Sequence, residues 1–358
     1  MNDKYGSKTR KKRLNILTSI KKSKERNEKE SKNRVRKQFK ETVRKLSTTP
    51  KSNKQLFCSP YSKSKRVSNQ TCFNTDTLDK LIDGYNKKYS YDKITLKKTD
   101  SPMQRWEELQ KKMQHKGTCT SEVCWIDELL LNKESKEKYK RLLFRPKQPV
   151  EWGKDPNTWL SDFDINKIME QYEKAHPNFK FIGPSFADFD KKIYQTSCVC
   201  NNLCNFSIEE QIKNGKSKIG VIFNLDTYGN GGTHWVAFFL DLDERALIYF
   251  DSNGVRPKPS IVRFKKKVVK QANDYMSPHK IRYYQNKLSH QRTNTECGMY
   301  CLYFIIAMLL RKIDILDEVS KDTVSFDDLI VFFTKQQISD SFVEQYREKL
   351  FKPLNKSE

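Results

Sequence analysis

One stretch decides how this chain folds: Gln291-Arg292-Thr293-Asn294-Thr295-Glu296-Cys297-Gly298-Met299-Tyr300-Cys301, a polar, turn-prone run that ends at a cysteine and a glycine. The apolar run from Met299 to Leu310 contains no glycine or proline, and this length and composition predict a buried helix. Cys297 then lies at the N-terminus of that helix, where the partial positive charge favours the thiolate that a nucleophilic cysteine needs. Gly298 allows another backbone, or a substrate, to approach the sulfur closely.

A nucleophilic thiolate needs a base, and a second stretch offers one. Two apolar strands, one beginning beside His234 and the other ending at Asp251, flank the polar segment from Asp241 to Arg245, which predicts a hairpin turn. If the turn is centred on Leu242-Asp243, His234 lies directly opposite Asp251, and such partners have Cβ atoms about 4.5–5.5 Å apart. A carboxylate there can keep an imidazole in one tautomer. The pairing assumes this register, because a slip of one residue would place the two side chains on opposite faces.

Taken together, these motifs resemble the adenain and ubiquitin-like-protein-specific (SUMO protease-like) cysteine proteases, most closely those of large DNA viruses. The resemblance covers roughly the C-terminal two-thirds of the chain. It rests on His234-Trp235 at a strand start, on Tyr249-Phe250-Asp251-Ser252 at the next strand's end, and on Gln291 followed after five residues by Cys297-Gly298. It implies His234 as general base, Asp251 as the residue that orients it, Cys297 as nucleophile and Gln291 as an oxyanion-hole donor.

The resemblance also implies a fold. We expect a papain-like α+β fold of the adenain/SUMO-protease type, in which a central, mainly antiparallel sheet is flanked by helices. Segments rich in aromatic and β-branched residues predict the strands, namely Ile219–Leu225, Trp235–Leu240, Ala246–Phe250 and Ile281–Tyr284. Helices are predicted at Ser260–Tyr275, Ser325–Thr334 and Ser339–Leu350.

A candidate substrate channel begins at Trp159-Leu160-Ser161-Asp162. In the family, a Trp-Leu-x-Asp segment at this place lines the channel for the extended C-terminal tail of the substrate. The resemblance therefore implies Trp159 and Asp162 as substrate-binding residues, and we add Trp235, the neighbour of the candidate base. The alternative is that the segment is a capped, packed helix start, with Ser161 or Asp162 as the N-cap.

Residues 1–75 are predicted to form a basic, largely disordered arm and linker. Residues 1–50 hold 18 Lys and Arg against 5 Asp and Glu, so they contribute a net charge of +13 to the total of +25. Few apolar residues accompany these charges, which is typical of a solvated, disordered tail. The composition also fits an arm that docks on nucleic acid or on an acidic partner, and the two interpretations are compatible.

Two further regions follow the arm. Residues 76–150 are predicted to be a helical accessory region, with short helices at Thr77–Tyr85 and from Ser101 onward. Residues 151–358 are assigned to the catalytic domain, because apolar residues concentrate after Trp152 and can form a core there.

The nine cysteines are interpreted as reduced thiols, because their number is odd and the N-terminus lacks the apolar core of a secretory signal. We expect no metal and no other cofactor, because two cysteine groups do not form clean pairs of metal ligands: Cys119 with Cys124, and Cys198 with Cys200 and Cys204. No apolar run reaches the roughly 18 residues that a membrane span requires. We therefore expect a cytosolic or nucleoplasmic location without secretion, and the resemblance implies the virion and the host cytoplasm, or the nucleus.

The predicted function is that of a thiol endopeptidase. The thiolate of Cys297 attacks a scissile carbonyl, and the backbone N–H of Cys297 and the side chain of Gln291 bind the oxyanion. The resemblance implies cleavage after small Gly-Gly-like sites, in viral structural precursors during particle maturation. One alternative is deconjugation of a ubiquitin-like modifier. Another is an inactive nucleic-acid-binding scaffold, against which the retention of all four catalytic residue types argues.

Overall fold

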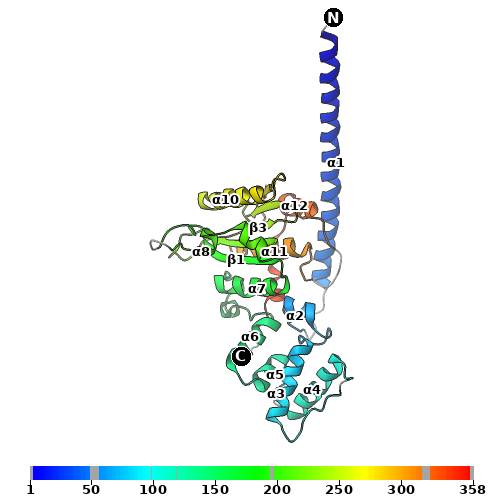
Figure 1. The fold of residues 1–358 in the computed structure, drawn as a ribbon, viewed down its shortest axis with the longest axis vertical. Coiled ribbons are helices and arrows are strands. Elements are labelled where there is room, and N and C mark those ends of the chain that lie inside the picture. The colour runs from blue at the N-terminus through cyan, green and yellow to red at the C-terminus, as the bar shows by residue number, and fades with distance from the viewer. Residues whose placement is uncertain are drawn as a thin grey trace.

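The computed structural model describes residues 3–48, 56–97, 99–117, 119–193, 197–316 and 323–354. It has three parts: a long N-terminal helix, a body built around a β-sheet, and a smaller helical lobe at the end of the molecule opposite the N-terminus (Figure 1). No helix in these ranges combines the length and the apolar character needed to cross a membrane.

The body contains a single five-stranded sheet in the order β1-β2-β3-β4-β5 among the described residues. Its strands are β1 (Phe179–Phe186), β2 (Lys218–Asn224), β3 (Trp235–Asp241), β4 (Ala246–Phe250) and β5 (Arg282–Gln285). β3 pairs antiparallel with β2 and β4, whereas β1 pairs in parallel with β2, and β5 with β4. The sheet is therefore mixed rather than mainly antiparallel. Each parallel pair is joined by a crossover containing helices, as parallel strands require.

Four of the strands were predicted to within two residues at each end, and β1 was missed. Gly183-Pro184 interrupts its apolar pattern, and proline cannot donate a ladder hydrogen bond. The strand tolerates proline because β1 lies at an edge of the sheet.

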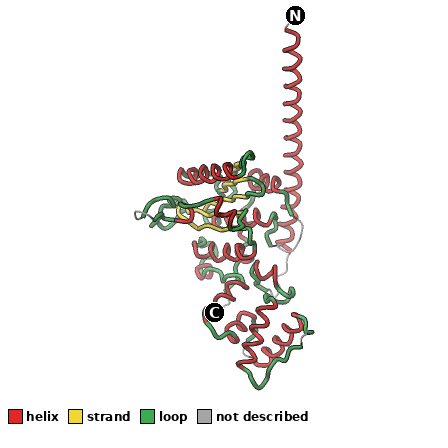
Figure 2. Tube along the Cα trace, in the orientation of Figure 1, coloured by secondary structure: helices red, strands yellow, loops and turns green. Residues whose placement is uncertain are grey.

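Helices cover both faces of the sheet, so the body has three layers (Figures 1 and 2). On one face, strand side chains such as Phe239 and Ile248 pack with α7 (Asp162–Ala175), α11 (Cys297–Leu310) and α12 (Phe326–Lys335). On the other face, side chains such as Phe238 and Tyr249 pack with α8 (Asn201–Cys204), α9 (Ile208–Lys213) and α10 (Pro259–Tyr275). Neighbouring residues of one strand thus pack into two different hydrophobic cores, because successive side chains of a strand point to opposite faces of the sheet.

α11 lies at the centre of the larger core. Every residue from Cys297 to Leu309 is buried. A helix that is apolar on all sides is stable only where protein surrounds it, so this place follows from its composition. The predicted buried helix is confirmed, and it begins at Cys297.

The C-terminal segment after α12 is less regular than the sequence predicted. A single helix was expected over Ser339–Leu350, but the structure has two short helices, α13 (Asp340–Glu344) and α14 (Arg347–Leu350). The break between them precedes Arg347, whose side chain extends inward to Glu296 at the start of α11.

The helical lobe contains the residues that were predicted to be a linker. It comprises α2 (Pro60–Lys65), α3 (Thr75–Lys88), α4 (Pro102–Lys116), α5 (Glu122–Leu129) and α6 (Lys133–Leu143), and a 3₁₀ helix at Val150–Gly153 leads into the body. Its core includes Cys58, Cys72 and Phe73, all fully buried. The linker prediction is therefore wrong from Cys58 onward. Polar composition concealed these few buried side chains, which are far apart from their partners in sequence.

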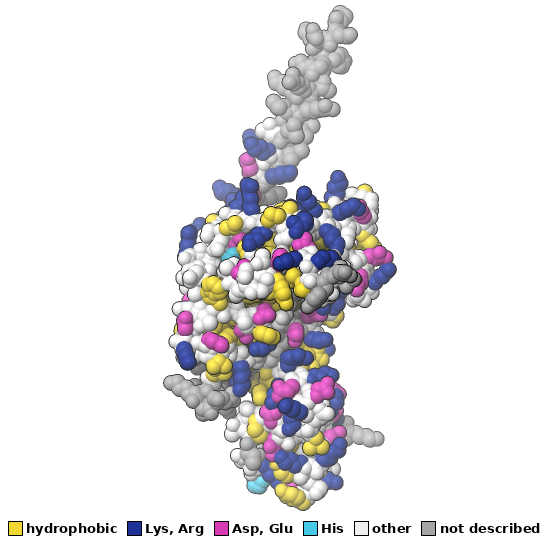
Figure 3. Space-filling model, turned by 90° about the vertical axis from the view of Figure 1, so that its left-hand side faces the viewer, with side chains coloured by type: hydrophobic (Ala, Val, Ile, Leu, Met, Phe, Trp, Pro, Cys, Tyr) yellow, Lys and Arg dark blue, Asp and Glu magenta, His cyan; other side chains and the backbone are white. Residues whose placement is uncertain are grey.

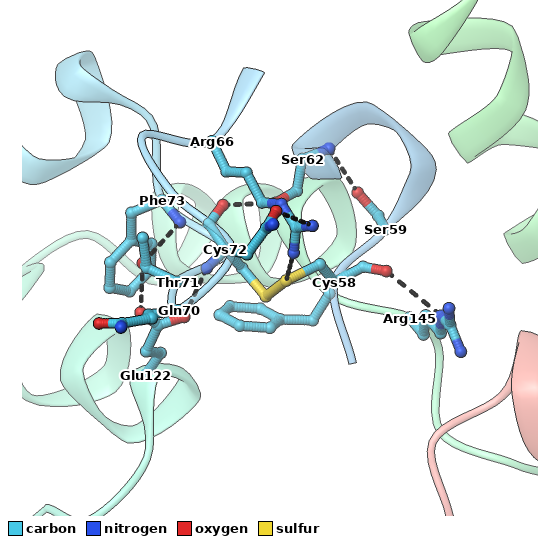
Figure 4. The surroundings of a disulfide bond; sticks show 12 residues. Cys58, Ser59, Ser62, Arg66, Gln70, Thr71, Cys72, Phe73, Glu122 and Arg145 are labelled. Atoms are coloured by element: carbon cyan, nitrogen blue, oxygen red, sulfur yellow. Dashed lines mark hydrogen bonds between the residues drawn. A yellow bond between two sulfur atoms is a disulfide. The ribbon is translucent and has the colours of Figure 1, made fainter. Parts of the chain in front are cut away.

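Three disulfides correct the prediction of reduced thiols. They join Cys58 to Cys72, Cys119 to Cys124, and Cys198 to Cys204, and the free thiols among the described residues are Cys200, Cys297 and Cys301. The fold brings the paired Cα atoms to 5.2–6.3 Å, within the range of a disulfide. Figure 4 shows the first bridge, which joins Cys58, just before α2, to Cys72, just before α3, with the buried carboxylate of Glu122 accepting the backbone N–H of Cys72 at 2.9 Å.

α1 (Asp3–Thr48) corrects the prediction of a largely disordered arm, because these residues form one helix that extends from the body (Figure 1). The C-terminal part of α1 docks on α12 and α13. Val35 and Leu46 are buried, and the Phe39 ring lies 5.4 Å from that of Phe332 and 4.8 Å from that of Phe342. Spacings of four and seven residues place these apolar side chains on one helix face, a stripe that the surrounding lysines obscured.

A buried ion pair joins the C-terminal segment to the start of α11. The side chains of Arg347 and Glu296 are 5% and 3% exposed, and their closest approach is 2.7 Å. Arg347 also donates to the backbone carbonyls of Pro156, Thr158 and Thr295. One side chain thus connects three separate segments.

Arg347→Ala is expected to lower the free energy of unfolding by about 3–5 kcal/mol, because it leaves the Glu296 carboxylate buried without a partner. Arg141→Ala serves as the control. It removes an exposed pair with Glu170, at 68% and 53% side-chain exposure, and should cost at most about 1 kcal/mol. Urea unfolding of both variants measures the difference. Equal losses in the free energy of unfolding would show that the buried Arg347–Glu296 pair stabilises the fold no more than the exposed pair does.

Candidate active site

Cys297 is the first residue of α11, directly after the N-cap residue Glu296, as the sequence predicted. The residue is only 1% exposed. Cys301 lies one turn further along the helix and is fully buried, and burial raises its pKa well above the ordinary value of a thiol. Only Cys297 of the two lies at the helix end, where backbone N–H groups favour a thiolate.

His234 and Asp251 are in direct contact, with 2.7 Å between Nε2 and Oδ1. His234 immediately precedes β3, and Asp251 immediately follows β4. The predicted register is corrected by two residues, since β3 and β4 pair Ala237 with Phe250. The two side chains therefore approach diagonally rather than directly across the ladder. Because the difference is even, both still extend from the same face.

The sequence singled out no partner for Asp251 other than His234, but Asn286 holds its backbone in place. Asn286 accepts the backbone N–H of Asp251 at 2.9 Å and donates to its carbonyl at 2.6 Å. The carboxylate oxygen that contacts His234 also accepts the backbone N–H of Asn253 at 2.8 Å. Asn286 directly follows β5. It lies 35 residues after Asp251, so no motif in the sequence indicated this role.

The charge of His234 follows from its two neighbours. Burial lowers the pKa of His234, but hydrogen bonds and charges from Asp251 and Cys297 outweigh it and raise the pKa to about 9. At neutral pH the ring is therefore an imidazolium. Nε2 is occupied by Asp251, which leaves Nδ1 as the ring nitrogen for Cys297. This arrangement is compatible with an imidazolium–thiolate pair.

Gln291 is oriented by Ser252, a residue of the second motif that received no role from the sequence. The hydroxyl of Ser252 donates to Oε1 of Gln291 at 2.7 Å, and its carbonyl accepts the backbone N–H of Gln291 at 3.0 Å. The acceptor end of the Gln291 amide is thereby used, and Nε2 remains as the donor end.

His290, the neighbour of Gln291, serves the structure. Its Nε2 donates to the carbonyl of Phe333 at 3.0 Å, and its Nδ1 accepts the backbone N–H of Ile338 at 3.3 Å. Burial lowers the pKa of His290 to about 4, so the ring is neutral at physiological pH. It therefore does not act as a second base.

The predicted substrate-binding segment lies against the start of α11. Trp235 donates from Nε1 to the carbonyl of Leu160 at 3.1 Å. A Cβ atom added at Gly298 would lie 3.2 Å from Leu160 and 3.4 Å from Trp235, so glycine permits this close packing. Trp235 is buried beside Gly298, whereas Trp159 is 41% exposed.

The alternative for this segment, a packed helix start, is present as well. Ser161 is the N-cap of α7, and its hydroxyl accepts the backbone N–H of Asp164. Asp162 is exposed in the first turn and accepts the backbone N–H of Phe163. The cap fixes where the exposed side chains of Trp159 and Asp162 lie relative to α11.

These residues together can perform nucleophilic acyl transfer. A cysteine at a helix N-terminus has a charged imidazole beside it, a carboxylate orients that imidazole, and an amide donor lies on the loop before the cysteine. Within the described ranges, no three His, Cys, Asp or Glu side chains form a group that could hold a metal ion.

Comparisons with known proteins agree with this chemistry. The model of the Ulp1 protease family, C-terminal catalytic domain, matches residues 165–341. The chain is 33% identical over 288 residues to the putative thiol protease R355 of Acanthamoeba polyphaga mimivirus, covering 76% of this chain and 90% of that relative. It is 28% identical over 260 residues to the SUMO-1 cysteine protease of African swine fever virus, covering 68% and 88%.

A solved structure shares the fold. The crystal structure of the African swine fever virus protease superimposes with a TM-score of 0.50 at 23% sequence identity, covering 73% of this chain and 94% of that chain. The family model covers β1 to β5 and α11. The alignment with the mimivirus relative covers 288 residues, which is longer than the predicted catalytic domain. The chain therefore belongs to the Ulp1 protease family and is a cysteine-type hydrolase.

Proposed function

We propose that the protein is an endopeptidase in which Cys297 is the nucleophile, His234 the general base and acid, and Asp251 the residue that orients it. Gln291 and the backbone N–H of Cys297 bind the oxyanion. The observation that carries this proposal is the placement of His234 between Asp251 and Cys297, which raises its pKa to about 9 at the N-terminus of α11.

In the first half of the reaction, the thiolate of Cys297 adds to the scissile carbonyl carbon and forms a tetrahedral oxyanion. As this intermediate collapses, the C–N bond breaks and the imidazolium of His234 gives its proton to the leaving amine. In the second half, neutral His234 takes a proton from water, and the hydroxide adds to the thioester. Cleavage of the C–S bond releases the acid and restores the thiolate and the imidazolium.

The proposed cleavage site is small and Gly-Gly-like. Cys297 is almost buried, and Leu160 and Trp235 pack directly against Gly298 beside it. An extended backbone with small side chains needs the least width to reach a sulfur in such a place. The exposed indole of Trp159, at the outer end of the same segment, would contact the residues that precede the cleavage site.

The proposed substrates are viral structural precursor proteins, cleaved during particle maturation in the virion and the host cytoplasm. The support is that the relatives reported above come from viruses. A second candidate is the removal of a ubiquitin-like modifier, which is favoured by the name of the relative from African swine fever virus, a SUMO-1 cysteine protease. Because both reactions use the same acyl-transfer chemistry, the products distinguish them.

Mapping of the cleavage products tests the function. Purified candidate precursors and a SUMO conjugate are incubated with the wild-type chain and with Cys297→Ala and Cys301→Ala. We expect new N-termini directly after Gly-Gly-like sites in a precursor, no product from Cys297→Ala, and most of the activity from Cys301→Ala, because Cys301 is buried away from the helix end. Release of the modifier alone would favour deconjugation. Equal cleavage by Cys297→Ala would contradict the mechanism.

Asp251→Asn is expected to move the alkaline limb of kcat/KM to lower pH. The charge of Asp251 helps to raise the pKa of His234 to about 9, so without it the imidazolium loses its proton at lower pH. His234→Ala should lower kcat/KM by about 10²–10⁴-fold and Asp251→Asn by less, because a thiolate remains a good nucleophile. The pH profile of peptide hydrolysis measures both effects. An unmoved limb, or the reverse order of the variants, would show that the roles are wrongly assigned.

We further propose that α1 binds nucleic acid. α1 presents many exposed basic side chains, of which Arg34 pairs with Asp328 of α12, and Figure 3 shows Lys and Arg at the base of this helix and on the neighbouring body. The exposed basic side chains of α1 include Lys21, Lys22, Lys24, Arg26, Lys29, Lys32, Arg34, Arg36, Lys37, Lys40, Arg44 and Lys45. A helix with charges spread along its length can contact several phosphates at once, which makes binding depend steeply on salt.

Replacing Lys21, Lys22, Lys24, Arg26 and Lys29 by Gln is expected to weaken DNA binding and to reduce the salt slope by about 0.9 for each phosphate that the helix no longer binds. The docked residues Val35 and Phe39 are left intact, and hydrolysis of a short peptide should not change. The control replaces Lys265, Lys266 and Lys270 on α10 by Gln. Titrations at several salt concentrations measure the slope. A slope that is unchanged by the α1 replacements would contradict the proposal.

A further inference from the structure

The loop between Gln291 and Cys297 is bound at its start by Asp340, the first residue of α13. One carboxylate oxygen of Asp340 accepts the backbone N–H groups of Arg292 and Thr293, at 2.9 and 2.8 Å. The other oxygen accepts the hydroxyl of Tyr300 at 2.9 Å. Tyr300 belongs to α11, one turn after Cys297. A single carboxylate therefore connects the residues directly after Gln291 to the helix that carries Cys297.

The end of the same loop is bound by Arg347, which contacts the carbonyl of Thr295 and the carboxylate of Glu296. Between the two anchors the loop has little packing. Arg292, Thr293 and Asn294 are exposed, and the loop borders a hollow of about 240 Å³ that Glu344 also lines. Hydrogen bonds rather than packed side chains therefore set the conformation of this loop.

The position of this loop matters because the two oxyanion donors lie at its two ends. The side chain of Gln291 and the backbone N–H of Cys297 must both lie about 2.7–3.1 Å from the same oxyanion. A displacement of about 1 Å in such a group can cost about 100-fold in rate. Ser252 fixes the orientation of the Gln291 amide, but within the described ranges its hydrogen bonds go to Gln291 and His290 and not to α11.

We propose that Asp340 is a positioning residue for the oxyanion hole, which sets the distance between the Gln291 amide and the Cys297 backbone by binding Arg292, Thr293 and Tyr300 together. This inference rests on the function proposed above. Among the described residues, the side-chain hydrogen bonds of Asp340 go to Arg292, Thr293 and Tyr300 and not to the His234–Asp251 pair, so it acts on the stabilisation of the oxyanion and not on the formation of the thiolate.

The test separates these two steps in the full-length chain. Peptide hydrolysis needs the oxyanion hole, whereas alkylation of Cys297 by iodoacetamide needs only the thiolate. For Asp340→Ala we expect kcat to fall about 10- to 100-fold, with KM and the alkylation rate within about twofold of wild type. Glu348→Ala, which removes an exposed acidic side chain from the same C-terminal segment, is the matched control and should leave all three values unchanged.

Asp340→Asn should recover most of the lost kcat. Its amide oxygen can accept the two backbone N–H groups, and its NH₂ group can donate to the Tyr300 hydroxyl, which still donates to the carbonyl of Ile338. If Asp340→Ala does not fold, Tyr300→Phe provides the second variant, since it removes one of the three contacts. We expect a smaller loss of kcat with the same unchanged alkylation rate.

Two results would overturn the proposal. A wild-type kcat in Asp340→Ala would show that the loop does not depend on this carboxylate. A parallel loss of kcat and alkylation would show a general disturbance of the site. Failure of the function itself is distinguishable, because it would appear as peptide cleavage by Cys297→Ala, whatever the behaviour of the Asp340 variants. A double variant of Asp340→Ala with Gln291→Ala should lose less than the product of the two single effects, since both act on the same oxyanion.

Discussion

The burial of α11 is the constraint on which the rest of the structure depends. This helix is apolar on every side, so the sheet, α7 and α12 must surround it, and its polar approach loop must remain at the surface. The nucleophile is therefore placed where the buried helix meets the exposed loop. His234 and Asp251 reach the same place because each lies just beyond the end of one of two adjacent strands that pack on α11.

Around this apolar centre, polar side chains from distant segments fix the backbone of the site. Asn286 binds the backbone of Asp251, Ser252 binds Gln291, and Asp340 binds the loop that follows Gln291. The Arg347–Glu296 pair then joins this loop to the residues before Trp159. The contacts of Asn286 and Arg347 satisfy buried backbone and charged groups that would otherwise lack a partner, so for these two residues geometry and stability have the same cause.

The sequence predicted some helices and strands accurately and missed other features of the fold, and the difference has a physical reason. The strands β2 to β5 and the helices α10, α11 and α12 have strong periodic patterns, and each was predicted to within two residues at its ends. β1 and the docking of α1 were not, because each depends on a partner far away in sequence. The disulfides were not either, because cysteines only 5 to 14 residues apart pair only if the folded backbone brings their Cα atoms within range. The apolar stripe with Val35 and Leu46 can be recognised as a packing surface only once α12 lies against it. Cys58 bonds to Cys72 only when the lobe has folded.

By itself, the sequence determined the chemical types and their order: a cysteine at the start of an apolar helix, a histidine before one strand and an aspartate after the next, and a glutamine just upstream of the cysteine. These follow from local composition and periodicity, which act over a few residues. The tertiary structure decided which of these groups meet and how each is charged. The two-residue shift in register, the raised pKa of His234 and the anchoring of the loop by Asp340 and Arg347 all arise from contacts across the fold, because distance and burial, unlike residue type, exist only after packing.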